Sequence, residues 1–238
     1  MNSNPRDTNF HSALTLGIET SGLVGSIALC RGEECLAEAF LEEAPRRHAQ
    51  TLVSQIGAML REAGHKVRDL DAVAVSIGPG SFTGLRVGVV CAKTLAYVMG
   101  CRLAAVDTLQ AIAANSPVGI DHVYVVADAL RGDAYVASYG FHDGTWTTEQ
   151  PPTIAAAQAW LAERTPGGVI SGPGLATYAQ FVPPGCRQLP AEAWTPRARV
   201  VAQLGLVQLE RGDAADCATL VPFYLRRSAA EERKASVE

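Results

Sequence analysis

The sequence predicts an α/β fold built from two related lobes, and three observations lead to this prediction. Segments with the apolar pattern of strands alternate with segments that carry a helical apolar stripe, as in folds with substantial parallel sheet. A strand, a polar turn and a second strand follow one another at residues 14–30, and the pattern returns at residues 123–141. The 238 residues are 48% hydrophobic and 18% charged, which is the composition of a chain that buries a core.

The first half begins with a hairpin whose two strands surround the polar turn ETSG at residues 19–22. A helical stripe that includes Leu52 and Ile56 predicts the first helix. Asp107 is expected to cap a short helix, and Gln110 is expected to complete a capping box. The remaining elements expected here are strands at residues 34–41, 71–77 and 102–106, and helices at residues 47–63 and 82–99.

The second half again begins with a hairpin that is followed by further strands and helices. Its hairpin is followed by a second turn signal, Asp143-Gly144, and the helix that begins at Thr195-Pro196 ends before Gly212. The other expected elements are a helix at residues 155–164, a strand at 169–171 and a proline-rich loop at 182–196. We expect a disordered lead at residues 1–13, a first lobe at 14–116, a second lobe at 117–226 and a charged mobile tail at 227–238.

Two related halves with a cleft between them are typical of the actin-like ATPase fold, in which two hairpin turns hold the phosphates of a nucleotide. The formal net charge of −4 argues against a dedicated nucleic-acid binder. The sequence contains no C-x-x-C pair and no H-x-x-x-H or H-E-x-x-H spacing, so neither a disulfide framework nor a protein-built metal site is expected. No secretory signal or membrane span is recognised, and we expect a cytoplasmic protein.

The turn Gly78-Pro79-Gly80-Ser81 lies where a strand leads into a helix. Glycine amides at such a junction can bind a phosphate, because no side chain blocks the approach and the helix N-terminus favours an anion. The alternative is a stiff turn with Ser81 as the helix N-cap, which is common loop chemistry. The corresponding turn of the second half, residues 128–133, has one glycine, two acids and a bulky leucine, and it is poorly suited to a triphosphate.

Small residues recur every fourth position along the second helix, at Gly84, Gly88, Ala92 and Ala96. Each glycine inside a helix costs up to about 1 kcal/mol relative to alanine, so close packing should offset that cost. This stripe either packs against the chain's own sheet or meets a helix of another subunit, and the sequence favours neither interpretation.

The run DLDAVAVSIGPGSFTGLRVG at residues 69–88 closely resembles the TsaB family (older name YeaZ), the bacterial accessory proteins of tRNA threonylcarbamoyladenosine biosynthesis. The resemblance covers about residues 14–226, and the closing PFYLR at residues 222–226 fits the family's order. One departure is Glu19, where the family usually has aspartate.

The resemblance implies an actin-like fold with two lobes and a paralogue of the catalytic subunit TsaD. TsaD carries a His-x-x-x-His metal motif where this sequence has TLQAI at residues 108–112, so the resemblance implies no catalytic residue and no metal site. It also implies no intrinsic cofactor, although ATP or ADP at the boundary of the complex is left open, with Gly78, Gly80 and Ser81 as possible contacts.

The partners that the resemblance implies are TsaD, the ATPase TsaE and, without TsaD, a second copy of the chain, with tRNA bound only through the complex. The family's pairing surface lies on helices of the first lobe. The interface residues expected here are Leu52, Ile56, Gly84, Gly88, Ala92 and Ala96.

Three alternatives remain at this point. The first is an independent ATP-binding kinase or ATPase of the same fold, and the poor second turn argues against it. The second is a peptidase with Ser21, Ser76 or Ser81 as nucleophile, for which no histidine lies in a supporting motif. The third is a stand-alone tRNA binder, which the acidic balance disfavours.

Overall fold

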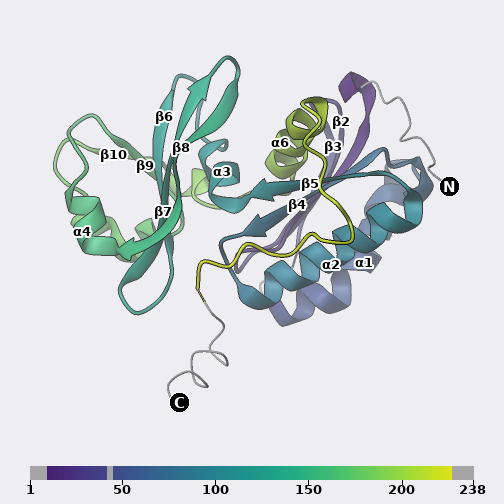
Figure 1. Cartoon of the computed structure of the whole chain (residues 1–238), viewed down its shortest axis with the longest axis horizontal. Helices are drawn as coiled ribbons and strands as arrows, with labels where there is room; N and C mark the ends of the chain where they lie inside the picture. The colour runs from purple at the N-terminus through teal and green to yellow at the C-terminus, as the bar shows by residue number, and fades with distance from the viewer. Residues whose placement is uncertain (1–9, 42–44, 227–238) are drawn as a thin grey trace, which may run out of the picture.

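The computed structural model describes residues 10–41 and 45–226 and consists of two lobes that lie side by side, each with its own mixed sheet (Figure 1). The first sheet has the strand order β3-β2-β1-β4-β5. Its strands are β1 (Leu14–Glu19), β2 (Ser26–Arg31), β3 (Glu34–Phe40), β4 (Ala72–Gly78) and β5 (Arg102–Asp107). The helices that follow or connect them are α1 (Pro45–Glu62), α2 (Phe82–Met99) and α3 (Thr108–Ala113).

The second sheet has the order β10-β9-β6-β7-β8 and repeats the topology of the first. In both sheets three strands form an antiparallel meander, and two further strands add parallel beside the first strand of that meander. The strands are β6 (His122–Asp128), β7 (Asp133–His142), β8 (Thr145–Ala156), β9 (Val169–Ser171) and β10 (Arg187–Gln188). The helices of this part of the chain are α4 (Ala157–Ala162), α5 (Leu175–Tyr178) and α6 (Ala198–Glu210). The repeated topology confirms the predicted duplication and the actin-like architecture.

The two faces of the first sheet carry side chains of different size. Large apolar residues such as Leu16, Ile18 and Val75 pack with α1 and α2 on one face. Alanines such as Ala28 and Ala74 lie on the other face, where α6 packs. Because these side chains are small, α6 approaches the sheet closely enough that a Cβ on Gly17 would lie 2.1 Å from the carbonyl oxygen of Ala198.

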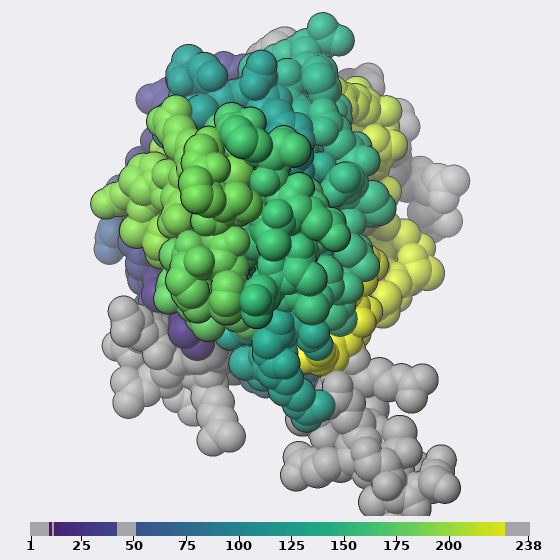
Figure 2. All heavy atoms as spheres, turned by 90° about the vertical axis from the view of Figure 1, so that its left-hand side faces the viewer, coloured from purple at the N-terminus to yellow at the C-terminus, as the bar shows by residue number. Residues whose placement is uncertain are grey.

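The division into lobes differs from the expected one at the C-terminal end. Residues 117–226 were expected to form the second lobe, but α6 packs on β1, β2, β4 and β5 of the first (Figure 1). The physical reason is that the alanine face of the first sheet needs a cover, which α6 provides. Residues 213–224 also return to the first lobe, where the Lys93 ammonium donates hydrogen bonds to the carbonyls of Ala218 and Leu220. Viewed from the second lobe, this C-terminal segment lies along one side of the molecule (Figure 2).

Some local expectations need correction. Asp107 caps α3 through a 2.8 Å bond from the Leu109 amide, but Gln110 donates its side-chain amide to the Trp146 carbonyl instead of completing a capping box. The expected helix at 155–164 begins at Ala157, because residues 155 and 156 extend β8. The proline-rich loop contains the short strand β10, which pairs with β9. Most of the expected lead lies outside the described residues, as does the expected tail, while Phe10–Ser12 form a short 3-10 helix.

Among the residues described, one helix, α2, is long and apolar enough by composition to be compared with a membrane span. This is weak evidence, because the core helix of a soluble protein passes the same test. In this fold the small-residue face of α2 is buried against the first sheet.

Candidate functional site

A cavity with a volume of about 670 Å³ lies between the two lobes of the described chain. This is within the size range of small-molecule pockets. It is lined by the turns of the two hairpins, by the junction between β4 and α2, and by the C-terminal segment at residues 223–226. Its apolar lining residues include Leu23, Leu109, Ile112, Leu130, Phe82 and Phe223.

Two amides of the β4–α2 turn donate hydrogen bonds within the chain. The Gly78 amide donates to the buried Thr108 hydroxyl at 3.1 Å, and the Ser81 amide donates to the Ser21 carbonyl at 2.7 Å. The Ser81 hydroxyl accepts from the Gly84 amide at 3.3 Å and thereby caps α2. A Cβ on Gly80 would lie 2.6 Å from the Ser21 carbonyl oxygen, so this glycine is required by the close approach of the first hairpin turn. The contacts favour the structural alternative, a turn with a serine N-cap.

Glu19 holds the first hairpin turn in place. Its Oε1 accepts hydrogen bonds from both the amide and the hydroxyl of Ser21, each at 2.5 Å. Burial raises the pKa of Glu19, and the hydrogen bonds from Ser21 oppose that rise by less. The side chain is fully buried and does not line the cavity. Glu19 therefore acts on its own turn, and Ser21 has an acid as its partner rather than the histidine that a peptidase triad requires.

The turn between β6 and β7 is also tied to its own chain. Leu130 and Arg131 have positive φ values of 67° and 59°, a backbone conformation that is costly for residues other than glycine. Asp128 Oδ1 accepts from the Leu130 amide and from the Tyr178 hydroxyl, both at 2.8 Å. The Asp133 carboxylate forms an ion pair with Arg226. The two acids of this turn are thus engaged, and the turn presents the exposed Leu130 to the cavity.

The C-terminal segment crosses between the lobes at the edge of the cavity. The Phe223 amide donates to the Ile77 carbonyl at 2.7 Å, and the Tyr224 ring stacks on Phe82 with 4.5 Å between centroids. Arg226 then bonds to the carbonyls of Ala129 and Leu130 in the second lobe. Sequence reasoning missed this role of residues 223–226; the paired aromatics next to an arginine were the available signal.

A partly buried acid lies beside the cavity, at the end of β5. Asp107 caps α3 and accepts a hydrogen bond from the Tyr139 hydroxyl. Burial raises the pKa of Asp107 to about 6, although the bonds from Tyr139 and from backbone amides act in the opposite direction. Within the described ranges, no group of three or more histidine, cysteine, aspartate or glutamate side chains is placed to hold a metal ion.

The six expected interface residues lie inside the first lobe, which corrects the expectation that they form a contact surface. Leu52, Ile56, Ala92 and Ala96 are buried in its core. Gly84 and Gly88 are buried against the first hairpin turn, since a Cβ on them would lie 1.9 Å from the Thr20 carbonyl oxygen and 2.2 Å from its Oγ1, respectively. The physical reason is that the sheet and its turn come too close to α2 for any larger residue.

The outward faces of the same two helices carry a different set of residues. Val53 of α1 and Val90 and Tyr97 of α2 are 67%, 62% and 81% exposed. Val90 and Tyr97 are seven residues apart and therefore lie on one side of α2. A helical projection places them on the side of α2 opposite the stripe of small residues. The sequence pattern of α2 therefore already indicated an exposed apolar surface on that side.

Comparisons with known proteins agree with this architecture. The model of the family "TsaD: tRNA N6-adenosine threonylcarbamoyltransferase" matches residues 41–184, more than half of the chain. The tRNA threonylcarbamoyladenosine biosynthesis protein TsaB of Bacillus subtilis is 29% identical over 225 residues, which is 92% of this chain and 96% of that protein. An uncharacterised protein of Mycobacterium tuberculosis (strain H37Rv) is 35% identical over 182 residues, 76% of each chain.

A solved structure shows the same fold. It is an uncharacterised protein from Pseudomonas aeruginosa, described as similar to the peptidase YeaZ. It matches with a TM-score of 0.79 and 26% identity over 90% of this chain and all of that one.

Proposed function

The chain belongs to the TsaD family, in its TsaB (YeaZ) branch, and on this premise we propose that it is a non-catalytic subunit of tRNA N6-threonylcarbamoyladenosine formation that binds and supports TsaD. One observation carries the non-catalytic part of the proposal. Several groups that could serve a nucleotide in the cavity are bonded within the chain itself, among them the Gly78 and Ser81 amides and the carboxylates of Asp128 and Asp133.

The outward faces of α1 and α2 are the proposed contact surface for TsaD. Val53, Val90 and Tyr97 are exposed apolar side chains on two helices that pack against each other. Aromatic side chains such as Tyr97 are enriched at protein interfaces and among the residues that contribute most of the binding energy. A second copy of the chain would use the same surface when TsaD is absent.

The remaining parts of the proposal concern the wider assembly in the cytoplasm. TsaE joins the pair formed with TsaD, and tRNA is bound only through the complex. ATP or ADP is held at the boundary of the subunits rather than by this chain alone. Isothermal calorimetry of the isolated chain with MgATP is expected to give no tight binding; tight binding together with ATP turnover would instead establish the alternative, an independent ATPase or kinase.

The decisive experiment is reconstitution of the tRNA modification from TsaD, the adenylate synthase and TsaE, with and without this chain. The variant Tyr97→Asp places a charge on the outward face of α2, where the side chain is 81% exposed, so we expect the chain to fold. We expect it to lose TsaD binding by at least about tenfold and to lose the stimulation of the modification.

Val118→Asp is the matched control, because Val118 is fully exposed on a loop away from these helices. It should bind TsaD like the unaltered chain. A folded Tyr97→Asp variant that still binds TsaD with full affinity would refute the proposed surface.

A further inference from the structure

Two cysteines face each other across the hairpin formed by β2 and β3. The strand register pairs Cys30 with Cys35, one step inside the closing pair Arg31–Glu34. The connection has only two residues, and its first, Gly32, has a φ of 55°, as in a type II′ turn. Such a connection makes the closing pair hydrogen-bonded, so the cysteine pair is the non-hydrogen-bonded kind, in which side chains approach most closely.

The expected spacing matches that of a disulfide. Opposed residues of a non-hydrogen-bonded pair have Cα atoms about 4.5 Å apart, and disulfides span about 4.4–6.8 Å between Cα atoms. A bulge between Leu29 and Cys30 shifts the register further along the strands, but it leaves the two cysteines opposed.

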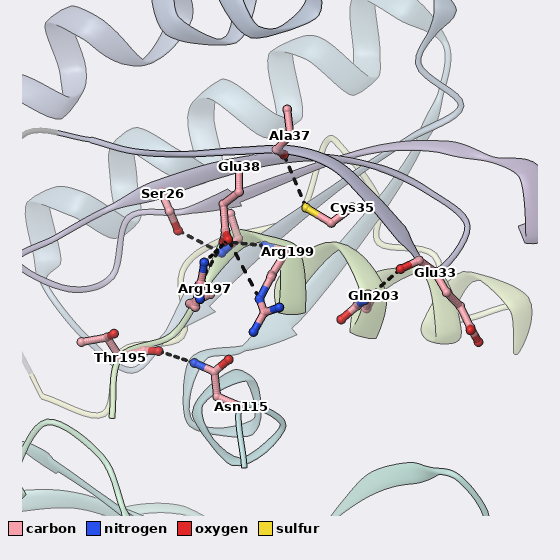
Figure 3. A network of polar contacts seen from close by, with 11 residues as sticks. Ser26, Glu33, Cys35, Ala37, Glu38, Asn115, Thr195, Arg197, Arg199 and Gln203 are labelled. Carbon is pink, nitrogen blue, oxygen red and sulfur yellow. Dashed lines mark hydrogen bonds and ion pairs between the residues drawn. The ribbon is translucent and has the colours of Figure 1, made fainter. Parts of the chain in front are cut away.

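The two thiols have unequal surroundings. Cys30 is 1% exposed and packs with Ala28, Ala198 and Ala202 beneath α6. Cys35 is exposed, and its Sγ lies 3.6 Å from the Ala37 carbonyl oxygen (Figure 3). Burial, and next to it the neighbouring Cys35 thiol, raises the pKa of Cys30 to about 12. A reagent from solution therefore reaches Cys35 first, and Cys30 reacts only with a partner already attached there.

We propose that Cys30 and Cys35 form a redox-active pair that closes to a cross-strand disulfide through exchange with a small disulfide such as oxidised glutathione. The Cys35 thiolate attacks one sulfur of that disulfide, the S–S bond of the oxidant breaks, and one glutathione thiolate leaves. Cys30 then loses its proton and attacks the Cys35 sulfur of the mixed disulfide, and the second glutathione leaves. Two protein thiols lose two electrons and two protons, and one glutathione disulfide becomes two glutathione thiols.

The cross-link would act on the edge strand of the first sheet. β3 is bonded to β2 alone within the sheet. It carries Glu38, which pairs with Arg197 and accepts a 3.3 Å bond from the Arg199 amide at the start of α6 (Figure 3). A disulfide at the hairpin end would restrain opening of this strand, and with it the anchor of α6. We expect slower amide hydrogen exchange along β3 in the oxidised form.

The experiment equilibrates the full chain with mixtures of reduced and oxidised glutathione. Free thiols are then alkylated after unfolding, and the peptides are mapped by mass. We expect a Cys30–Cys35 disulfide in the unaltered chain, with the mixed disulfide at Cys35 at least about tenfold less abundant, because the second step is intramolecular. The cysteines at positions 91, 101, 186 and 217 are internal references.

Two variants test the order of the steps. Cys30→Ala suits the alanine cluster around that position and is expected to accumulate the glutathione adduct at Cys35. Cys35→Ser changes an exposed side chain and is expected to leave Cys30 reduced. The proposal fails if the unaltered chain retains the Cys35 adduct with Cys30 still free, or if neither cysteine reacts more than the reference cysteines.

Discussion

Gly84 is the position at which the structure makes its sharpest prediction about stability. A Cβ added there would lie 1.9 Å from the Thr20 carbonyl oxygen. This is about 1 Å less than 3.0 Å, the distance below which Cβ contacts essentially never occur in proteins. The obstacle is backbone in the hairpin turn, and Thr20 is itself fully buried. The clash can therefore be relieved only if α2 moves away from the sheet. That movement would also disturb the hydrogen bond from the Thr20 hydroxyl to the Gly84 carbonyl.

Two opposing effects set the magnitude of Gly84→Ala. Alanine is favoured over glycine inside a helix by about 1 kcal/mol. Overpacking of a core costs about 1–3 kcal/mol and more where backbone must shift. Because the contact at Gly84 is with backbone, we expect the steric cost to win and the free energy of unfolding to fall by about 2 kcal/mol or more.

Gly57 supplies the matched control in the neighbouring helix α1. A Cβ there would meet only the end of the flexible Arg61 side chain, at 3.4 Å. Gly57→Ala should therefore raise the free energy of unfolding by about 0.5–1 kcal/mol through helix propensity. Urea unfolding followed by far-ultraviolet circular dichroism measures both variants. Tryptophan fluorescence is the weaker probe, since Trp146, Trp160 and Trp194 all lie outside the first lobe.

If Gly84→Ala proved neutral, or stabilised the chain as Gly57→Ala does, α2 could not sit on the first hairpin turn as described. The small-residue stripe would then be available to a partner helix, and the conclusion that it packs against the chain's own hairpin turn would be wrong. A smaller loss for Gly88→Ala would be consistent with the account, because its obstacle is the Thr20 side chain rather than backbone.

Two further predictions follow from the partly buried acid and from the C-terminal segment. The folded state holds the proton of Asp107 up to a pKa of about 6, whereas an unfolded aspartate releases it near pH 4. This group's contribution to stability therefore falls as pH rises from about 4 to 6, by up to about 3 kcal/mol, and Asp107→Asn should remove that decline in urea titrations at each pH. An unchanged pH profile in the variant would contradict the raised pKa. Arg226→Met removes the ion pair to Asp133 and should loosen the β6–β7 turn, so that trypsin cuts after Arg131 at least about threefold faster. Arg211→Met, at the exposed end of α6, should leave that rate unchanged, and equal rates in both variants would show that Arg226 does not restrain the turn.

Periodicity and turn chemistry predicted the order of strands and helices well, because those signals are local. The hairpin at residues 14–30 and the junction at residues 78–82 are examples: apolar runs and glycines specify them without reference to distant residues. The return of α6 to the first lobe was not predictable in this way. The apolar pattern of its inner face would be the same whichever of the two sheets it covered. The sheet that α6 covers is determined by the alanines of the first sheet, which are far away in sequence.

The small-residue stripe of α2 was expected at an interface, and the burial of its residues has a related reason. A stripe of small residues indicates that another segment packs closely against the helix. It does not indicate whether that segment belongs to the same chain or to a partner. At Gly84 and Gly88 the approaching group is the chain's own Thr20. At Gly78 and Gly80 the close contacts come from Phe223 and Ser21, which are again the chain's own.

These contacts have a common consequence for function. In a phosphate-binding turn the glycines leave the approach open, so that backbone amides can face the phosphate. Here the same glycines allow the first hairpin turn, α2 and the C-terminal segment to pack on one another, and the Ser81 amide already bonds to Ser21. Substituting Gly80 would therefore be expected to destabilise the first lobe before it affected any ligand. Packing within the chain is therefore enough to account for the glycines of this turn, and their presence alone does not indicate a bound phosphate.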